Sequence, residues 1–204
     1  MFSIKIYQRI VKLFYFLKSR RNWRRIQEKQ NIKLEIGSGS KSGINGFITV
    51  DTVKGSDLFQ DLRKGIPLGD KRVEFIYSSH LLEHMSFHEL IKLLKECHRV
   101  LQKGGIFSVC VPNARKYIES YIKNETFQLN DLMYQPAVVD TGSFIDQINY
   151  IAYMGGEHKY LFDEQNLINI LKIAGFDKVE LRKFDPSIDL FERDHESIYA
   201  IGIK

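Results

Sequence analysis

The sequence lacks several features that would tie it to an oxidising compartment or a membrane. It has only two cysteines, Cys97 and Cys110, which lack metal-ligand spacing, so we expect two reduced, buried thiols. It contains no uncharged apolar run of about 18 residues, and lysine and arginine interrupt residues 1–20, which argues against a transmembrane helix and a signal peptide. With 204 residues and 44% hydrophobic content, these absences favour a cytoplasmic protein with one globular domain.

Acidic residues are nearly missing from residues 1–33, which hold ten Lys or Arg and one acid. Apolar residues in this segment recur at helical spacing from Ile6 to Leu17, so we expect residues 1–32 to form a basic amphipathic helical arm ahead of a domain over 33–204. Such an arm suits an anionic membrane, an acidic substrate or nucleic acid. Nucleic acid is not favoured, because the body lacks a basic patch interleaved with aromatic residues. We expect residues 1–30 to contact the anionic inner membrane surface or to cover the sheet.

Beyond the arm, short apolar runs separated by turns predict strands over 33–36, 47–50, 57–60, 73–77 and 106–111. Two further strands, over 177–184 and 197–203, are expected to form an antiparallel hairpin. Alternation of strands with helices predicts an α/β, Rossmann-like fold with an open, mostly parallel sheet.

Two helices carry recognisable end signals. Ser86 and Glu89 form a capping box before an apolar repeat that runs to Leu101 and stops at Gly104-Gly105. Asp163 caps the second helix, which ends at Gly175. Residues 113–157 show weak periodicity and give no clear prediction, and their aromatic residues suit either core or an acceptor platform.

The stretch LEIGSGSKSGINGFITVD, residues 34–51, places a glycine turn between two predicted strands. Gly37 and Gly39 allow a ligand to approach the backbone and tolerate positive φ. The spacing misses the dinucleotide fingerprint G-x-G-x-x-G, and no Gly-Lys-Ser/Thr follows to make a phosphate loop. Residues 37–46 barely reach the length of a helical crossover, so a phosphate-binding helix N-terminus is not expected. Asp51 is placed to bind a ribose diol, which predicts a nucleoside ligand without a phosphate chain.

An ordered set of motifs resembles class I S-adenosylmethionine-dependent methyltransferases: Leu34–Gly39 with Asp51, Asp61-Leu62, Tyr77–His84, Leu101–Gly105, Val111–Asn113 and His158–Phe176. The resemblance implies S-adenosyl-L-methionine as cofactor and a methyl group moved to an acceptor. By this resemblance Glu35 and the Gly37–Gly39 turn meet the methionyl end of the cofactor, and Asp51 binds its ribose. Asp61 and Leu62 flank the adenine, and Ser79 and His80 line the pocket. The cofactor-binding set is therefore Glu35, Gly37, Ser38, Gly39, Asp51, Asp61, Leu62, Ser79 and His80.

The links after the first two strands are too short for the helices that most members of this family have there. In this respect the chain resembles a compact subgroup associated with bacterial surface-polysaccharide biosynthesis. The resemblance implies a small-molecule or saccharide acceptor, methylated at oxygen. A hydroxyl acceptor needs a base, for which His158 is the first candidate and His84 the second, because imidazole titrates near neutral pH.

Two other functions compete with this prediction. His80-Leu81-Leu82-Glu83-His84 matches the H-x-x-E-H pattern of zinc peptidases, but the capping box starts a helix only after His84, so we expect no metal. A non-catalytic interaction protein would keep the fold with a degenerate site. Single residues also have structural alternatives: Asp51 and Asp61 suit turn caps, and His158 suits a loop anchor.

Overall fold

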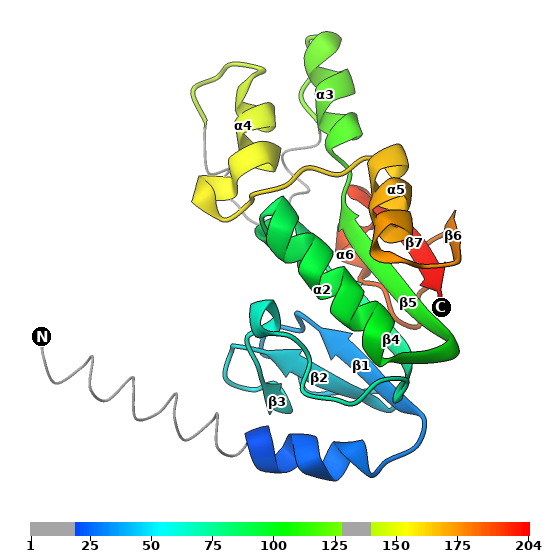
Figure 1. Cartoon of the computed structure of the whole chain (residues 1–204). Helices are drawn as coiled ribbons and strands as arrows, with labels where there is room; N and C mark the ends of the chain where they lie inside the picture. Colours follow the sequence, from blue (N-terminus) through cyan, green and yellow to red (C-terminus); the bar gives the residue numbers. More distant parts are fainter. Residues whose placement is uncertain (1–18, 128–139) are drawn as a thin grey trace, which may run out of the picture.

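One open sheet of seven strands organises the protein. The computed structural model describes residues 19–127 and 140–204 (Figure 1). Parallel pairing joins β3, β2, β1, β4 and β5 in that order, and β7 then pairs antiparallel with both β5 and β6. The strands are β1 (Ile32–Ile36), β2 (Phe47–Asp51), β3 (Leu58–Phe59), β4 (Val73–Ser79), β5 (Leu101–Pro112), β6 (Lys178–Leu181) and β7 (Ser197–Ile203). The predicted α/β fold, with its mostly parallel sheet and C-terminal antiparallel hairpin, is confirmed.

No helix lies between β1 and β2 or between β2 and β3, as the short links predict. Polar contacts hold these links instead. Asp57 accepts hydrogen bonds through Oδ2 from the Thr49 amide at 3.0 Å, the Thr49 hydroxyl at 2.9 Å and the Gly43 amide at 3.2 Å. A single carboxylate therefore supplies acceptors that tie both links to β2.

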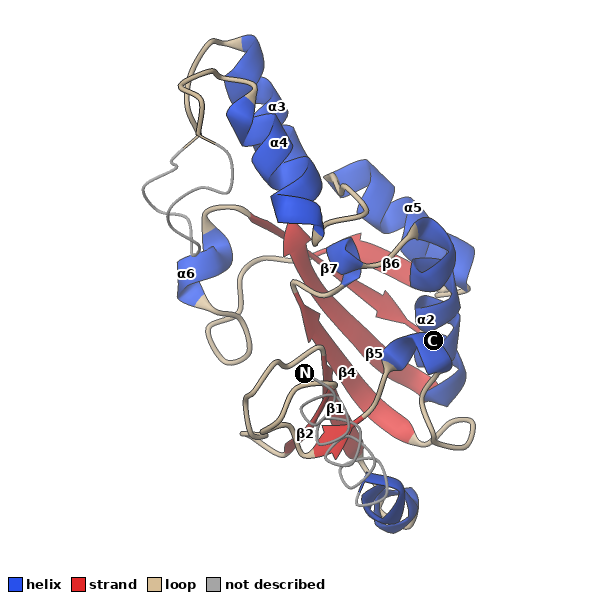
Figure 2. Ribbon diagram, turned by 90° about the vertical axis from the view of Figure 1, so that its left-hand side faces the viewer, coloured by secondary structure: helices blue, strands red, loops and turns tan. Residues whose placement is uncertain are grey.

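Two helices, α2 (Phe87–Val100) and α5 (Glu164–Ala174), lie on one face of the sheet (Figure 2). Their apolar sides bury Leu90, Leu94, Leu167 and Leu171 against alternate strand residues such as Ile76. Both helices begin as predicted: α2 at the Ser86–Glu89 capping box, and α5 at Asp163, whose side chain accepts from the Asn166 amide.

Helices α3 (Ala114–Ile122) and α4 (Asp146–Tyr153) pair beyond one end of the sheet (Figure 1). They enclose a separate small apolar cluster around Tyr117 and Tyr150, so these aromatic residues are core. A 3₁₀ turn, η4 (Met154–Gly156), then returns the chain toward the sheet. The short helix α6 (Phe191–Asp194) lies on the face opposite α2 (Figure 2).

Residues 19–27 are helical and pack as part of the same body. Trp23 and Ile26 are 3% and 6% exposed and belong to the hydrophobic cluster that contains α2. Gln27 donates to the Pro67 carbonyl at 3.0 Å. The apolar stripe Ile6–Leu17 lies outside the described residues, and the division into residues 1–32 and 33–204 stays a prediction. Among the described helices, none is long and apolar enough to cross a membrane.

Three predicted boundaries need correction. Helix α2 ends at Val100 rather than running through Leu101, because Leu101 already pairs with Val73 in the sheet. Strand β5 therefore begins before the glycine pair at 104–105. Strand β6 covers only Lys178–Leu181, since the chain turns away after it toward α6.

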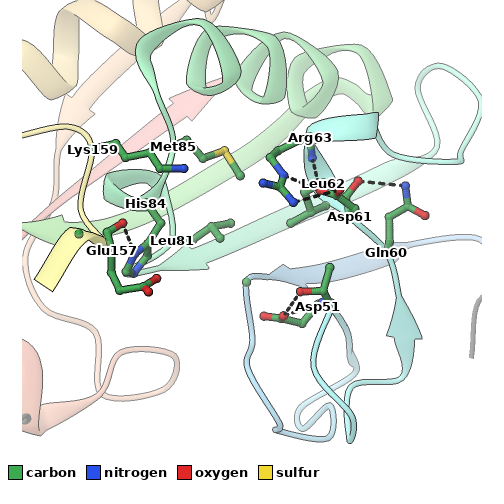
Figure 3. Close-up of a pocket in the computed structure, with 13 residues that line it drawn as sticks. Asp51, Gln60, Asp61, Leu62, Arg63, Leu81, His84, Met85, Glu157 and Lys159 are labelled. Atoms are coloured by element: carbon green, nitrogen blue, oxygen red, sulfur yellow. Dashed lines mark hydrogen bonds and ion pairs between the residues drawn. The ribbon is translucent and has the colours of Figure 1, made fainter. Parts of the chain in front are cut away.

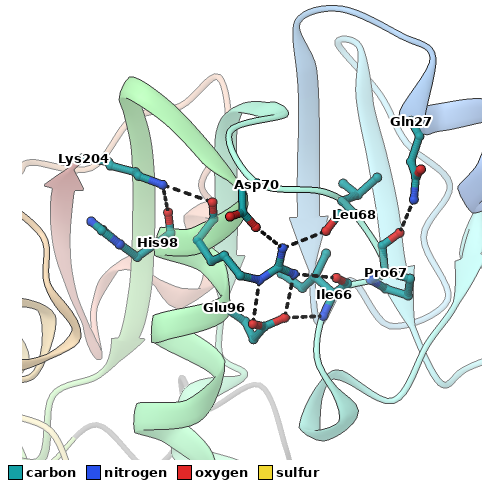
Figure 4. A network of polar contacts seen from close by, with 9 residues as sticks. Gln27, Ile66, Pro67, Leu68, Asp70, Glu96, His98 and Lys204 are labelled. Atoms are coloured by element: carbon teal, nitrogen blue, oxygen red, sulfur yellow. Dashed lines mark hydrogen bonds and ion pairs between the residues drawn. The ribbon is translucent and has the colours of Figure 1, made fainter.

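A network of polar contacts at the end of α2 holds the segment between β3 and β4, in which Figure 4 labels Ile66, Leu68 and Glu96. Arg99 is the central residue of this network. Its guanidinium donates to the carbonyls of Leu68 and Ile66 at 2.8 and 3.0 Å. Glu96 accepts from Arg99 at 2.8 and 2.9 Å and from the Ile66 amide at 3.2 Å. The adjoining guanidinium lowers the pKa of Glu96 despite partial burial. This ion pair therefore satisfies loop backbone groups that have no helical partners.

We predict that Glu96→Gln lowers the free energy of unfolding by about 1–2 kcal/mol at neutral pH, because it removes a charge-assisted pair and weakens the loop bond. Since the folded-state pKa of Glu96 is depressed, its stabilisation is present above its unfolded value of 4.5 and is lost as the pH falls through the folded value. The two proteins should therefore converge in acid. Urea unfolding at neutral and acidic pH measures this, with Glu180→Gln on exposed β6 as control. A constant difference at both pH values would contradict the assignment.

Candidate functional site

A cavity of about 480 Å³ opens at the carboxyl ends of β1, β2 and β4 (Figure 3). Its volume lies in the range of small-molecule sites, and its position is where open α/β sheets bind ligands. The residues that line it come from the ends of β1 and β2, from the segment after β3 with its 3₁₀ turn, from the 3₁₀ turn between β4 and α2, and from η4 and the loop after it: Gly37, Asp51, Thr52, Gln60, Asp61, Leu62, Arg63, Leu81, His84, Met85, Gly156, Glu157 and Lys159. Five residues predicted as functional, Gly37, Asp51, Asp61, Leu62 and His84, are thus brought together.

Gly37 forms the wall of the cavity beside Leu81. Its φ of +71° is in the left-handed region, and a Cβ placed on it would lie 2.7 Å from Leu81 Cβ. Any other residue would strain the backbone and collide with Leu81. Gly39 also has positive φ, +64°, but a Cβ there would meet nothing within 4 Å. The two glycines of the turn are therefore required for different reasons.

Asp51 connects the glycine turn to the end of β2. Its Oδ2 accepts from the Gly39 amide at 2.8 Å, and its Oδ1 accepts from the amides of Thr52 at 2.5 Å and Val53 at 3.1 Å. Its side chain lies at the cavity wall (Figure 3). Asp51 therefore caps the turn, as the structural alternative predicts, and it also lines the cavity.

Asp61 caps the 3₁₀ turn η1 (Leu62–Lys64) and accepts from Arg63 Nε at 2.9 Å and Nη2 at 3.2 Å. This guanidinium lowers the pKa of Asp61, so the carboxylate is charged at neutral pH. Leu62, 6% exposed, adds an apolar surface beside it. A carboxylate and an aliphatic side chain together suit a flat heterocycle with hydrogen-bond donors at its edge.

Other predicted residues lie away from this cavity's lining. Glu35, on the opposite face of the sheet, approaches Lys41 at 3.6 Å and lines a second cavity with Phe47 and Tyr77. Ser38 and Ser79 are buried, and Gly39 touches the site through its bond to Asp51. His80 has φ of +49° and its Nε2 lies 2.8 Å from the Ser197 hydroxyl. Burial and the Arg193 charge lower the pKa of His80.

Behind the cavity, Glu83, His84 and His158 form a cluster whose candidate ligand atoms lie within 4.8 Å of one another. Glu83 and His84 belong to the 3₁₀ turn η2 (Leu82–His84), and His158 follows η4. The imidazole rings of the two histidines are 5.1 Å apart. Burial raises the pKa of Glu83 to about 8 and lowers the pKa of His158. His84 lines the cavity, and His158 is buried behind it.

The motif analysis missed several lining residues. Gln60, Arg63 and Met85 are ordinary in sequence, and their place depends on loop geometry. Gly156 and Glu157 come from a region whose periodicity gave no prediction, although Gly155-Gly156 before His158 was a usable turn signal. Lys159 lies inside the His158–Phe176 motif but was given no role there. Both sets reach the cavity because η4 and the β3–β4 segment converge on the carboxyl edge (Figure 3).

Comparison with known proteins identifies the family. The profile described as "Methyltransferase domain" matches residues 8–181, most of the chain. A comparison with curated protein sequences finds no match.

Solved structures share the fold at low sequence identity. An S-adenosylmethionine-dependent methyltransferase from Archaeoglobus fulgidus is 16% identical, with 92% of this chain and 93% of that chain covered and a TM-score of 0.52. One from Mesorhizobium loti is also 16% identical, with 90% and 96% covered and a TM-score of 0.52. Burkholderia thailandensis 1,6-didemethyltoxoflavin-N1-methyltransferase, solved with that compound and S-adenosylhomocysteine, is 12% identical, with 98% and 89% covered and a TM-score of 0.52.

The sheet order, the glycine turn with its acidic residue after β2, and the profile match agree. The chain therefore belongs to the methyltransferase domain family and shares the fold of solved S-adenosylmethionine-dependent methyltransferases.

Proposed function

We propose that the cavity beside Gly37 binds S-adenosyl-L-methionine and that the protein transfers its methyl group to a hydroxyl of a small-molecule or saccharide acceptor. The observation that carries the proposal is the joining of Gly37, Asp51 and Asp61 in one cavity at the carboxyl edge of the sheet. The cofactor supplies an activated methyl group on a sulfonium. The protein then has to orient the acceptor in line with that group and exclude water.

In this arrangement Asp51 accepts from the ribose hydroxyls, and Asp61 with Leu62 flanks the adenine. Asp51 is suited to this role because three of its roughly four acceptor positions take backbone amides, and the other takes the Thr52 hydroxyl at 3.4 Å, a long bond that a ribose hydroxyl can replace. The backbone at Gly37 faces the methionyl part, where the lack of a side chain permits close approach. Glu35 supports the turn from the other face through its charge rather than by lining this cavity.

The acceptor hydroxyl has to lose its proton during methyl transfer, and His84 and His158 are the proposed recipients. His84 is the better placed because it lines the cavity. His158 does not line the cavity, and its ring packs edge-on against the ring of His84. A polysaccharide precursor fits the compact, helix-poor links of this chain, which resemble the surface-polysaccharide subgroup. Incubation with methyl-labelled cofactor and a panel of sugar, phenol and amine acceptors tests the class; label on amines alone would contradict oxygen transfer.

We predict that Asp51→Ala weakens S-adenosyl-L-methionine binding by about 10- to 1000-fold, because it removes charge-assisted hydrogen bonds. It should also lower the melting temperature, since the amides of Gly39, Thr52 and Val53 lose their acceptor. Asp51→Asn should fall between wild type and alanine. Isothermal titration of the cofactor, beside a melt of each unliganded protein, measures both effects.

Asp57→Ala is the matched control, because Asp57 also accepts bonds from the β2 region but does not line the cavity. It should lower the melting temperature and leave the affinity of the folded protein unchanged. If both variants bound the cofactor like wild type, the ribose assignment would fail.

We propose in addition that the basic arm brings the enzyme to an anionic membrane surface. In the described part of the arm, Arg20, Arg21, Arg24 and Arg25 are exposed, whereas Trp23 and Ile26 are buried in the core. This part can therefore contribute charge but not an inserted apolar face. Basic residues near an anionic leaflet contribute about 1 kcal/mol each.

Replacing these four arginines with glutamine should reduce flotation with phosphatidylglycerol-containing vesicles and leave flotation with neutral vesicles at its low level. The effect should fade at high salt, as expected for screened charge. Lys92→Gln with Lys95→Gln on exposed α2 positions is the control. Equal binding to both vesicle types, or no change in the arginine variant, would exclude the electrostatic role.

A further inference from the structure

The carboxylate of Glu83 is buried without a counter-charge in contact. The residue is 2% exposed, and neither of its side-chain oxygens has a hydrogen-bond partner from another residue within 19–127 and 140–204. The nearest imidazole nitrogens are His80 Nδ1 at 3.7 Å and His84 Nε2 at 3.9 Å, both too distant for hydrogen bonds. A buried polar group left in this state points to a missing partner, such as an ion.

The two histidines of the cluster have their tautomers set by backbone carbonyls. His84 Nδ1 lies 3.1 Å from the Glu157 carbonyl, and His158 Nδ1 lies 2.7 Å from the Ile151 carbonyl. A carbonyl only accepts, so Nδ1 carries the proton in each ring and Nε2 keeps its lone pair. Histidine ligands in metal sites are oriented in this way, with one nitrogen donating to a carbonyl and the other facing the ion.

The segments that carry the cluster are also fastened to each other. The amides of Lys159 and Tyr160 donate to the Glu83 carbonyl at 2.8 and 3.2 Å. This fixes the backbone on either side of the cluster, so only side-chain rotations are needed to bring the ligand atoms closer. For tetrahedral zinc, ligand atoms at about 2.1 Å from the ion lie about 3.4 Å apart, against the present upper separation of 4.8 Å.

From this geometry we propose that Glu83, His84 and His158 bind one divalent first-row transition-metal ion, with Zn²⁺ as the reference ion. Two imidazoles and one carboxylate are a donor set that suits such ions and leaves coordination positions open. The sequence argument against a metal was that the capping box starts a helix only after His84, so the two histidines of H-x-x-E-H do not share a helix. The structure leaves His80 out of the triad and supplies His158 in its place.

The position of the ion gives it a role that rests on the proposed function. His84 lines the cofactor cavity, so an open coordination position on that side faces the acceptor. A hydroxyl bound to the ion would have a lowered pKa and would lose its proton to solvent more readily. If an ion binds both Nε2 atoms, neither histidine is free to act as a base. The metal and the free histidine are therefore alternative ways to remove the proton of the acceptor hydroxyl.

The test is a titration of chelator-treated full-length protein with Co²⁺, followed by visible absorption, and then competition with Zn²⁺. We expect one ion per chain and a weakening of about 100-fold or more in Glu83→Gln and in His158→Asn. His88→Gln, which changes an exposed histidine outside the cluster, should bind like wild type. Circular dichroism of each variant before titration establishes that it is folded.

Absence of stoichiometric binding, or binding that survives both cluster substitutions, would overturn the metal site. Titration of the Glu83→Gln variant with S-adenosyl-L-methionine separates this failure from failure of the proposed function, since Glu83 does not line the cofactor cavity. In the wild-type protein, cofactor binding without metal binding would refute the metal site alone, whereas in Glu83→Gln that combination is the expected result. Metal binding without cofactor binding would refute the proposed cofactor site and leave the ion in place.

Discussion

The Asp51 carboxylate joins the glycine turn to the end of β2, at an edge of the sheet where no helix connects β1 with β2. Three backbone amides, from Gly39, Thr52 and Val53, point at its two oxygens. In a protein with a full crossover helix, much of this link would be ordered by the helix's own backbone hydrogen bonds. Here the links are too short, so one side chain orders the glycine turn and faces the cavity at once. Under the proposed function, cofactor binding and local folding are therefore coupled at this residue.

Charged side chains also hold a loop on the other side of the cavity. The segment between β3 and β4 has only the 3₁₀ turn η1 and no α-helix, and the guanidinium of Arg99 with the carboxylate of Glu96 satisfies two of its carbonyls and one amide (Figure 4). Asp61 and Leu62, at the start of this segment, line the cavity. The Asp51 carboxylate and the Arg99–Glu96 ion pair thus position loops that would otherwise need crossover helices. This explains how a compact chain keeps the ligand edge of a larger fold.

Much of the fold could be predicted because its signals are local. The capping box at Ser86 and Glu89, the apolar repeat of α5 and the short strands are all encoded within a few residues of each other. The cofactor turn was predictable for the same reason, since Gly37 and Asp51 follow consecutive strands that are neighbours in a parallel sheet. Glu35 shows the limit, because alternation along β1 places its side chain on the opposite face.

The Glu83, His84 and His158 cluster could not be read from the sequence in the same way. His158 is distant in sequence and reaches Glu83 only through the pairing of α3 with α4 and the return turn η4, in a region with weak periodicity. The H-x-x-E-H pattern instead drew attention to His80, whose Nε2 faces Ser197. The local motif therefore contains two members of the cluster, Glu83 and His84, while its first histidine, His80, lies outside the cluster.

The central claim is that S-adenosyl-L-methionine binds where the Gly37 turn meets Leu81. Calorimetric titration of the cofactor into Gly37→Ala and Gly39→Ala tests it most directly, because both substitutions strain a positive φ but only the first drives a Cβ into Leu81. With affinities corrected for the folded fraction, the account predicts a loss for Gly37→Ala that exceeds the loss for Gly39→Ala by about tenfold or more. Equal affinities in the two variants would contradict it.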